Sequence, residues 1–296
     1  MQLELPSKIT KFELEGRIFY VKRDELVNPF LAGNKFRKLY ALIQTSSDKY
    51  NHIISYGGTQ SNAMLAIAAM CKQKGWSFTY YTKPLSRALQ NEECGNYFEA
   101  KKLGMNHIEI AYEYYRDFIA SLMLNLDEKT FIIDQGGAIK EANIGLEVLA
   151  QEIKESKLGV KALATPSGTG TTALFLALNL PDYKIYTTPC VGDTSYLKEQ
   201  LSALGKIPSN LIILEPKKKY HFAKPYPEFL SIYKKLLETG IEFDLVYSPS
   251  LWISLLEQTN EEILYIHSGG VSGNESMLKR YRQKNFRNYS TNKIKI

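Results

Sequence analysis

The chain has 296 residues, of which 44% are hydrophobic and 23% are charged, proportions that are ordinary for a globular protein. No apolar run approaches the ~20 residues of a membrane span, and the first residues show no secretory pattern. The three cysteines form no CxxC or Cys/His ligand spacing, which excludes a disulfide framework and a cysteine-based zinc site. We therefore expect a cytoplasmic protein with no membrane partner and no metal.

The formal net charge of +6 is concentrated near the end of the chain. The last stretch carries seven basic side chains and no acidic one: Lys279, Arg280, Arg282, Lys284, Arg287, Lys293 and Lys295. A polyanion could bind such a tail. No nucleic-acid motif accompanies the charge, so we predict a solvated C-terminal helix rather than a nucleic-acid partner.

Strand-like and helix-like segments alternate through the first half of the chain. An extended segment at Phe19–Val21 precedes a helix with Asn34 as its N-cap. A second helix begins at Ser61 or Asn62 and runs to Lys74, where Gly75 ends it. The other elements predicted here are strands at His52–Tyr56, Phe78–Thr82, His107–Ala111 and Phe131–Asp134, and a helix over Glu141–Glu155.

The same alternation continues through the second half. Strands are predicted at Ala162–Thr165, Lys184–Thr187, Leu211–Leu214, Leu245–Tyr247 and Ile263–His267. Helices are predicted at Thr171–Leu180, Tyr196–Leu204, Glu228–Thr239 and Leu251–Gln258. Short apolar strands separated by helices indicate an α/β fold with parallel sheets covered on both faces. No Pro/Gly/Ser-rich linker marks a boundary, so a second domain would have to be inserted within the first.

Lys35 is the first candidate for chemistry. It follows Gly33-Asn34 directly, at the start of a predicted helix. An isolated lysine is most often a solvated surface residue. A desolvated lysine near the positive end of a helix has a lowered pKa, however, and can act as a nucleophile and a base.

The turn Ser167–Thr172 follows a predicted strand and opens a predicted helix. Backbone N–H groups at a helix start favour anions, and the threonine hydroxyls can donate further hydrogen bonds. The loop also fits a loose dinucleotide pattern through Gly168, Gly170 and Ala173. That pattern requires an acidic residue at the end of the next strand, and Asp193 comes too late. The residues therefore favour a monophosphate, although a plain strand-to-helix turn stays possible.

Together, three separate segments meet the needs of pyridoxal 5'-phosphate (PLP). The Lys35 amine can form a Schiff base with the PLP aldehyde, and the Gly/Thr loop can bind the phosphate. The turn Gln60-Ser61-Asn62, by itself an ordinary helix cap, can contact the ring hydroxyl and a substrate carboxylate.

In combination and in this order, the motifs resemble those of the 1-aminocyclopropane-1-carboxylate (ACC) deaminase / D-cysteine desulfhydrase family of fold-type-II PLP-dependent enzymes. The matching segments are Val21-Lys22-Arg23-Asp24, Gly33-Asn34-Lys35-Phe36-Arg37-Lys38, Gly57-Gly58 with Gln60-Ser61-Asn62, Gly168-Thr169-Gly170-Thr171-Thr172, Val246-Tyr247-Ser248 and Ile266-His267-Ser268-Gly269-Gly270. The resemblance implies a tryptophan synthase β-like fold of two parallel-sheet α/β domains with the active site between them. Residues 1–39 and 147–296 would form the larger PLP-binding domain, and residues 40–146 the smaller inserted one. It also implies a homodimer.

The resemblance further implies a set of site residues. The catalytic residues would be Lys35, Ser61 and Tyr247. The substrate, a small amino acid, would contact Gln60, Ser61, Asn62 and Tyr247. The cofactor would be held by Lys35, Lys38, Asn62, Gly168, Thr169, Gly170, Thr171, Thr172 and Ser248, with Ser248 at the pyridine nitrogen.

Ser248 stands where ACC deaminases place a glutamate after the tyrosine, and desulfhydrase-like members have a hydroxyl there. We expect a hydroxyl to favour a neutral ring, which suits loss of a good leaving group better than opening of a cyclopropane. The predicted reaction is therefore α,β-elimination from D-cysteine, giving pyruvate, ammonia and sulfide. ACC deamination is the alternative. Because residues 220–225 and 247–251 depart from the family pattern, a non-catalytic or nucleotide-binding relative remains a further alternative.

Overall fold

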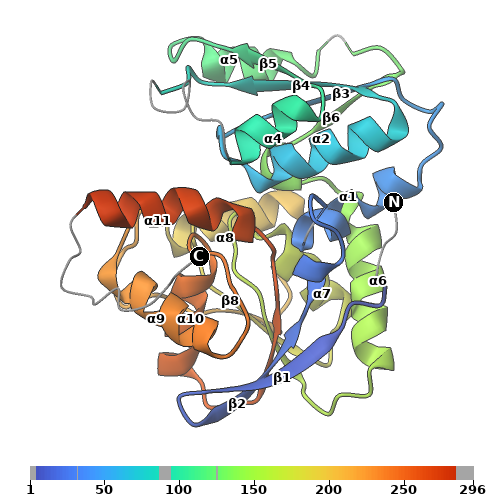
Figure 1. Ribbon diagram of the computed structural model, residues 1–296. Helices are drawn as coiled ribbons and strands as arrows, with labels where there is room; N and C mark the ends of the chain where they lie inside the picture. The colour runs from blue at the N-terminus through green and yellow to red at the C-terminus, as the bar shows by residue number, and fades with distance from the viewer. Residues whose placement is uncertain (1–4, 32, 87–94, 125, 285–296) are drawn as a thin grey trace.

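A computed structural model describes residues 5–31, 33–86, 95–124 and 126–284 of the chain. Two sheets organise it, one in the upper and one in the lower part of Figure 1. The larger sheet has six strands, and its order is β1 (Ile9–Leu14), β2 (Arg17–Lys22), β10 (Ile263–Ile266), β7 (Ala162–Ala164), β8 (Lys184–Thr187) and β9 (Leu211–Ile213).

The smaller sheet has four strands, all of which pair in parallel. Its order is β5 (Met105–Glu109), β4 (Ser77–Thr82), β3 (His52–Tyr56) and β6 (Thr130–Ile133). The larger sheet is parallel except at one edge, where β1 pairs antiparallel with β2. This antiparallel edge strand was not predicted from the sequence.

Helices connect the strands and cover both faces of the larger sheet. Their bounds are α1 (Asn34–Gln44), α2 (Asn62–Lys74), α4 (Asn96–Lys102), α5 (Tyr115–Ser121), α6 (Ala142–Glu155), α7 (Thr171–Asn179), α8 (Thr194–Leu204), α9 (Pro227–Glu238), α10 (Ser248–Gln258) and α11 (Asn274–Gln283). Short 3-10 turns lie at Asp24–Leu26, Gln135–Gly137 and Val271–Gly273.

Alternate residues of β10 show how both faces are buried. Leu264 and Ile266 join the core that α1, α2, α6 and α7 share with the strands, whereas Ile263 and Tyr265 join the core under α9 and α10. Side chains of both sheets, such as Ile53 of β3 and Leu163 of β7, belong to the first of these cores. The apolar strand segments of the sequence therefore match strands covered on both faces.

Most predicted elements lie within a few residues of the observed ones, with three differences. Asn34 is the first residue of α1, and the N-cap is Gly33, with φ of 60° and no side-chain cap. The predicted strand Leu245–Tyr247 is wrong, and so is the predicted helix start at Leu251, because α10 begins at Ser248. The physical reason is Asp244, whose carboxylate accepts hydrogen bonds from the backbone of the next turn and folds it toward the helix.

The domain boundaries near residues 40 and 146 stay a prediction. The smaller sheet draws its strands from residues 52–133, and the larger sheet from residues 9–22 and 162–266. The chain thus enters and leaves the smaller sheet through α1 and α6, which pack against each other on the right-hand side of Figure 1.

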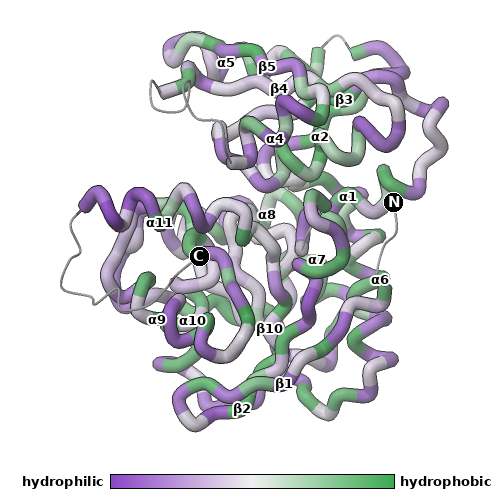
Figure 2. The backbone as a smooth tube through the Cα atoms, in the orientation of Figure 1, coloured by the Kyte–Doolittle hydropathy of each residue, from purple (hydrophilic) through white to green (hydrophobic). Residues whose placement is uncertain are grey.

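α11 lies at the surface, and hydrophilic residues prevail along it in Figure 2. Met277 and Tyr281 are buried and anchor it to a small apolar cluster with Leu230, Tyr233 and Leu245. The basic residues Arg287, Lys293 and Lys295 lie outside the described residues. Among the helices of residues 5–284 that the structure describes, none has the length and apolar character needed to cross a membrane.

Candidate active site

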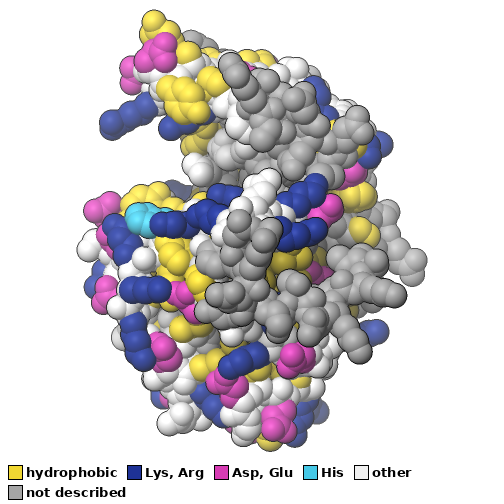
Figure 3. Space-filling model, turned by 60° about the vertical axis from the view of Figure 1, so that its left-hand side comes forward, with side chains coloured by type: hydrophobic (Ala, Val, Ile, Leu, Met, Phe, Trp, Pro, Cys, Tyr) yellow, Lys and Arg dark blue, Asp and Glu magenta, His cyan; other side chains and the backbone are white. Residues whose placement is uncertain are grey.

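The candidate residues lie where strands of both sheets end. β3 is followed by Gly57, β6 by Gln135, β7 by the Ser167–Thr172 turn and β10 by His267. The carboxyl ends of parallel strands are the usual location of ligand sites in α/β proteins. Figure 3 shows the surface hollowed between the part that contains the smaller sheet and the rest, with lysine and arginine side chains along the lower margin.

Lys35 is placed by a close backbone contact before α1. A Cβ on Gly33 would lie 2.2 Å from the carbonyl carbon of Ser268, and the Asn34 N–H donates to the Ser268 carbonyl at 3.3 Å. Only glycine fits this approach at a positive φ. The Lys35 Nζ donates to Asn34 Oδ1 at 2.7 Å. Burial lowers the pKa of Lys35 to about 8, although Asp244 acts in the opposite direction.

Lys38 joins the two sheets. One turn further along α1, its Nζ donates to the Gly136 carbonyl after β6 at 3.0 Å and to Thr169 Oγ1 after β7 at 3.4 Å. Burial, and next the charge of Lys35, lower the pKa of Lys38 well below its ordinary value. Lys38 thus contacts the start of the Thr169–Thr172 segment, and Lys35 lies near enough to influence its charge.

The Gly/Thr loop has the conformation that an anion site needs. Gly170 has φ of 75° and forms the N-cap of α7, where a Cβ would lie 2.5 Å from Leu201 Cδ2. The first N–H groups of a helix have no partner within the helix. Thr169 and Thr171 share a hydrogen bond of 2.9 Å, and the buried hydroxyl of Thr172 has no partner among the described residues. This donor set fits a phosphate group.

The Gln60–Asn62 turn has other partners. Ser61 Oγ caps α2 by accepting from the N–H groups of Ala63 and Met64, at 3.2 and 3.3 Å. Asn62 Oδ1 accepts from Asn96 Nδ2 at 2.6 Å. Gln60 Oε1 faces Gly95, where a Cβ would lie 2.9 Å away. The polar atoms of this turn are thus used largely within the part that holds the smaller sheet.

Asn62 nevertheless reaches the larger sheet. A Cβ on Gly270 would lie 2.5 Å from Asn62 Nδ2 and 3.6 Å from the Asp244 Cβ. Asn96 makes a second link, because its Oδ1 accepts from Ser272 Oγ at 2.9 Å. The structure thus brings Asn62 and Asp244 to the same glycine. It records no contact between Gln60 and Lys35 among the described residues.

Tyr247 lies beside the loop, and Ser248 follows it as the first residue of α10. A Cβ on Gly168 would lie 3.3 Å from Tyr247 Cε1, and the Tyr247 ring lies 5.4 Å from that of Phe222. Ser248 is buried, and its hydroxyl donates to Asp244 Oδ2 at 2.5 Å. Asp193, considered for a dinucleotide site, instead caps α8 by accepting from the Tyr196 N–H.

Sequence reasoning missed three contributors to this site. Asp244 contacts Ser248 and influences Lys35, Gly136 supplies a carbonyl to Lys38, and Asn96 binds Asn62. Aspartate favours turns in which its side chain accepts from the backbone two residues later, a signal that could have revealed the first. The other two depend on contacts between distant segments, which local patterns do not contain.

Comparison with known proteins gives relatives that span nearly the whole chain. A candidate ACC deaminase from Pyrococcus furiosus is 27% identical, over 88% of this chain and 87% of the relative. A bifunctional D-cysteine desulfhydrase/ACC deaminase from Arabidopsis thaliana is 24% identical, over 91% of this chain and 77% of the relative. Over most of its length, the chain is thus similar to proteins named as ACC deaminases and D-cysteine desulfhydrases. No protein-family model matches it.

Solved structures establish that the chain has the fold-type-II architecture. An ACC deaminase homologue superposes with a TM-score of 0.76 at 22% identity, covering 94% of this chain and 95% of the other. A cysteine synthase from Entamoeba histolytica superposes with a TM-score of 0.66 at 13% identity, covering 99% and 91%. The predicted fold class and the predicted resemblance are both confirmed.

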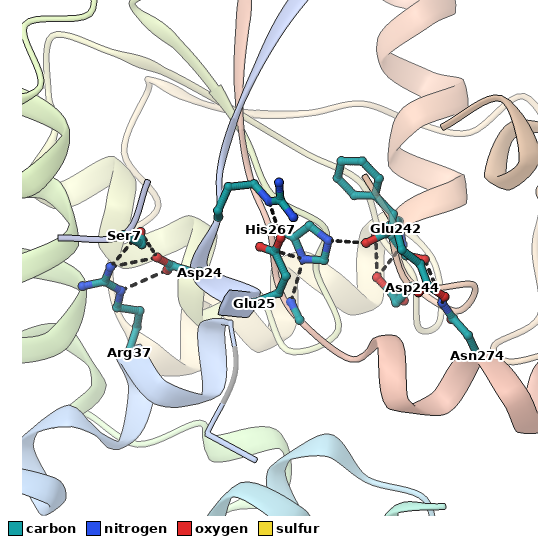
Figure 4. A network of polar contacts seen from close by, with 12 residues as sticks. Ser7, Asp24, Glu25, Arg37, Glu242, Asp244, His267 and Asn274 are labelled. Atoms are coloured by element: carbon teal, nitrogen blue, oxygen red, sulfur yellow. Dashed lines mark hydrogen bonds and ion pairs between the residues drawn. The ribbon is translucent and has the colours of Figure 1, made fainter. Parts of the chain in front are cut away.

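Two residues of the matched motifs, Arg37 and Lys22, stabilise the start of α1. Arg37 is fully buried; its guanidinium binds Asp24 at 2.8 Å and Glu152 of α6 at 2.7 Å. Lys22 binds the same Glu152 at 2.7 Å, and Ser7 donates to Asp24 at 2.6 Å. Figure 4 shows Arg37, Asp24 and Ser7 as one cluster. These ion pairs connect β2, α1 and α6, and α1 is the helix that carries Lys35.

His267 has a structural position as well. Its Nε2 lies 2.9 Å from the Glu242 carbonyl, and its Nδ1 accepts from the Gly269 N–H at 3.1 Å. In Figure 4 it lies between Glu25 and Glu242. Both ring nitrogens thus have protein partners, and His267 holds the Ser268-Gly269 backbone that packs on Gly33.

Proposed function

We propose that the protein binds PLP and acts as a PLP-dependent lyase or deaminase on a small amino acid. One observation carries this proposal: Lys38, with Lys35 close enough to act on its charge, contacts a glycine-threonine helix start in which the buried Thr172 hydroxyl has no partner among the described residues. A lysine of lowered pKa beside a phosphate-type anion site is the combination that PLP requires.

Each residue then has a definite role toward the cofactor. Lys35 would bind the aldehyde, and Lys38 with the Gly168–Thr172 loop would hold the phosphate. Asn62 would contact the ring oxygen and Ser248 the ring nitrogen. When bound, PLP supplies an electron sink for the negative charge that develops at the substrate α-carbon.

The remaining roles concern the substrate. Lys35, whose pKa of about 8 allows it to take and return protons near neutral pH, moves the α-proton. Ser61 contacts the substrate when its hydroxyl leaves the hydrogen bonds that cap α2. Gln60, Asn62 and Tyr247 complete the surface around the substrate. Tyr247 is close to Gly168 and therefore lies on the side of the phosphate loop.

We propose α,β-elimination from D-cysteine as the leading reaction, giving pyruvate, ammonia and sulfide. The bifunctional name of the Arabidopsis thaliana relative supports it. A structural neighbour from Fusobacterium nucleatum is described as a hydrogen sulfide-producing enzyme, with a TM-score of 0.64 at 14% identity. ACC deamination is the second candidate, because the Pyrococcus furiosus relative carries that name.

We also propose a homodimer and the two-domain division, with residues 40–146 as the inserted domain. The division is supported by the residue ranges of the two sheets. Sedimentation of the purified protein tests the dimer.

The experiment that tests the function begins with the cofactor. PLP added to the purified protein should give a visible absorption band, and borohydride should fix the cofactor on Lys35, as read by peptide mass. Lys35→Ala should abolish both the absorption band and the borohydride labelling, while the protein stays folded. Labelling of a different lysine, or no uptake of PLP, would contradict the proposal. Sulfide, pyruvate and α-ketobutyrate assays with D-cysteine, L-cysteine and ACC then identify the reaction.

A further inference from the structure

Asp244 is a buried carboxylate whose hydrogen bonds fix the direction of the Ser248 hydroxyl. Its Oδ1 accepts from the N–H groups of Val246 and Tyr247, at 3.0 and 2.6 Å. Its Oδ2 accepts from the Ser248 N–H at 3.3 Å and from the Ser248 hydroxyl at 2.5 Å. An ionised carboxylate can only accept hydrogen bonds, so the single hydroxyl proton of Ser248 must point to Asp244.

The surroundings leave no competing base for that proton. The groups around Asp244 are Lys35, Cys190, Tyr247, Tyr265 and Ser248. The Cys190 Sγ lies 3.4 Å from the Tyr247 carbonyl, to which it donates. The Tyr265 hydroxyl is fully buried and close enough to Ser248 to donate a hydrogen bond to its oxygen, so it is a further donor rather than a competing acceptor for the Ser248 proton. Asp244 therefore remains the acceptor for Ser248.

This polarity limits what Ser248 can do to a ligand. Because its proton points to Asp244, the hydroxyl can offer a ligand only the lone pairs of its oxygen. A ring nitrogen that carries a proton can donate to those lone pairs. A neutral pyridine nitrogen, which is an acceptor, would face an acceptor and gain nothing.

The position of Asp244 fits the far side of a ring attached to Lys35. In PLP the ring nitrogen lies directly opposite the carbon that bears the aldehyde. Asp244 acts electrostatically on Lys35, and its Cβ lies close to Gly270, beside Asn62. A ring between Lys35 and Ser248 would thus have its nitrogen on the side of the Ser248–Asp244 pair.

We infer that Asp244 is a positioning residue that acts through the Ser248 hydroxyl to hold the pyridine nitrogen of PLP in its protonated form. The inference rests on the proposed function, and it reverses the expectation, drawn from the hydroxyl alone, of a neutral ring. ACC deaminases place a carboxylate directly after the tyrosine. Here the carboxylate is that of Asp244, and it acts through the hydroxyl of Ser248.

The test uses PLP labelled with ¹⁵N in the ring and bound to the full-length protein. Attachment to Lys35 is first verified by borohydride reduction and peptide mass, so a failure of the proposed function is recognised separately. The ¹⁵N resonance of the native protein should lie at the pyridinium position. In Asp244→Asn, the amide oxygen can still accept from Val246 and Tyr247, whereas the amide nitrogen faces Ser248. The hydroxyl proton is then free for the ring, and the resonance should move to the neutral pyridine position.

Two further variants complete the test. Asp134→Asn removes a different carboxylate, which accepts from Tyr56 at 3.0 Å, and should leave the resonance unchanged. Ser248→Ala removes the bridging hydroxyl and should also give the neutral position, so the inference can be judged even if Asp244→Asn does not fold. A neutral resonance in the native protein, or a pyridinium resonance that persists in Asp244→Asn or Ser248→Ala, would overturn it.

Discussion

Arg37 Nη2 lies 2.8 Å from Asp24 Oδ1, and neither side chain is exposed to solvent. Arg37 belongs to the same helix as Lys35 and Lys38, whereas Asp24 follows β2. This pair connects the strand to the helix that carries both candidate lysines. It is further fixed by Glu152, which also binds Lys22.

Removing one member of this pair should destabilise the protein strongly. Asp24→Ala leaves the Arg37 charge buried with one partner fewer, and such changes cost about 3–5 kcal/mol. Urea denaturation should show this loss of unfolding free energy. Lys102→Ala, which breaks an exposed pair with Glu99, is the matched control and should change little. Equal stability of the two variants would mean that the buried network does not hold α1 in place.

Glu152 should make stability depend on pH in the acid range. Burial acts to raise the pKa of Glu152, but hydrogen bonds and charge from Arg37 and Lys22 outweigh it and lower the pKa from 4.5. A carboxyl whose pKa is lower when folded stabilises the protein above the unfolded pKa and loses that effect as pH falls. Glu152→Gln should therefore be less stable than the native protein at pH 7, with the difference shrinking below pH ~4.5. Thermal unfolding across pH 3–8 measures the stability of both proteins. A stability difference that does not change with pH would contradict the lowered pKa of Glu152.

Local patterns predicted much of this fold because its strands are short and apolar and its helices have clear end signals. Ser61 and Gly75 bound α2 as expected, and β3 and β8 match the predicted segments. Leu245–Tyr247 was misread because three apolar or aromatic residues in a row suit a strand. The turn there depends on Asp244.

The candidate site was harder to predict than the fold. Lys38 was expected in the site from the family resemblance, but its contact with Gly136 joins segments 98 positions apart. The direction of the Ser248 hydroxyl depends on a side-chain hydrogen bond that no spacing encodes. Position along the chain therefore indicated the candidate residues, while their protonation states required the structure.

Substitution of Thr172 should weaken PLP binding without lowering the stability of the protein. Its hydroxyl is buried with no partner among the described residues, so Thr172→Val removes a polar atom that the cofactor-free protein does not use. Stability without PLP should be unchanged or higher. PLP affinity should fall by about 1–3 kcal/mol, because a hydrogen bond to a charged phosphate is lost.

Fluorescence titration with PLP measures this affinity, and saturating PLP should restore much of the activity. Ser254→Ala is the control, since this hydroxyl on α10 is also buried without a partner among the described residues. It should leave PLP affinity as it is. If the Thr172→Val protein bound PLP as tightly as the native protein, this loop would not be the phosphate-binding site.

The uptake of PLP should depend on pH through Lys35. Only the neutral amine attacks an aldehyde, and burial lowers the pKa of Lys35 from 10.5 to about 8. The rate of covalent attachment should therefore rise with pH and level off above about 8. Asp244 raises this pKa, so Asp244→Asn should move the midpoint to lower pH. Stopped-flow absorbance at a series of pH values tests both points; a midpoint near 10 would show a solvated Lys35.

Asp244 should also influence which substrate reacts. A protonated ring accepts the negative charge from the substrate α-carbon more readily than a neutral one does. Elimination from D-cysteine is helped by a good leaving group, whereas opening of the ACC ring has no such help. Asp244→Asn should therefore reduce ACC turnover, where the native protein shows it, more than sulfide release. Each ~1.4 kcal/mol of difference in stabilisation of the two transition states changes the rate ratio about tenfold.

Both reactions are measured on the same Lys35-bound preparation, with α-ketobutyrate reporting ACC turnover and sulfide reporting elimination. Asp134→Asn serves as the control and should keep the native ratio. Ser248→Glu places a carboxylate directly at the ring nitrogen but beside Asp244, where two like charges repel. Combining it with Asp244→Asn relieves that repulsion and should shift the ratio toward ACC. A ratio that stays the same in all of these variants would show that the ring nitrogen does not decide between the substrates.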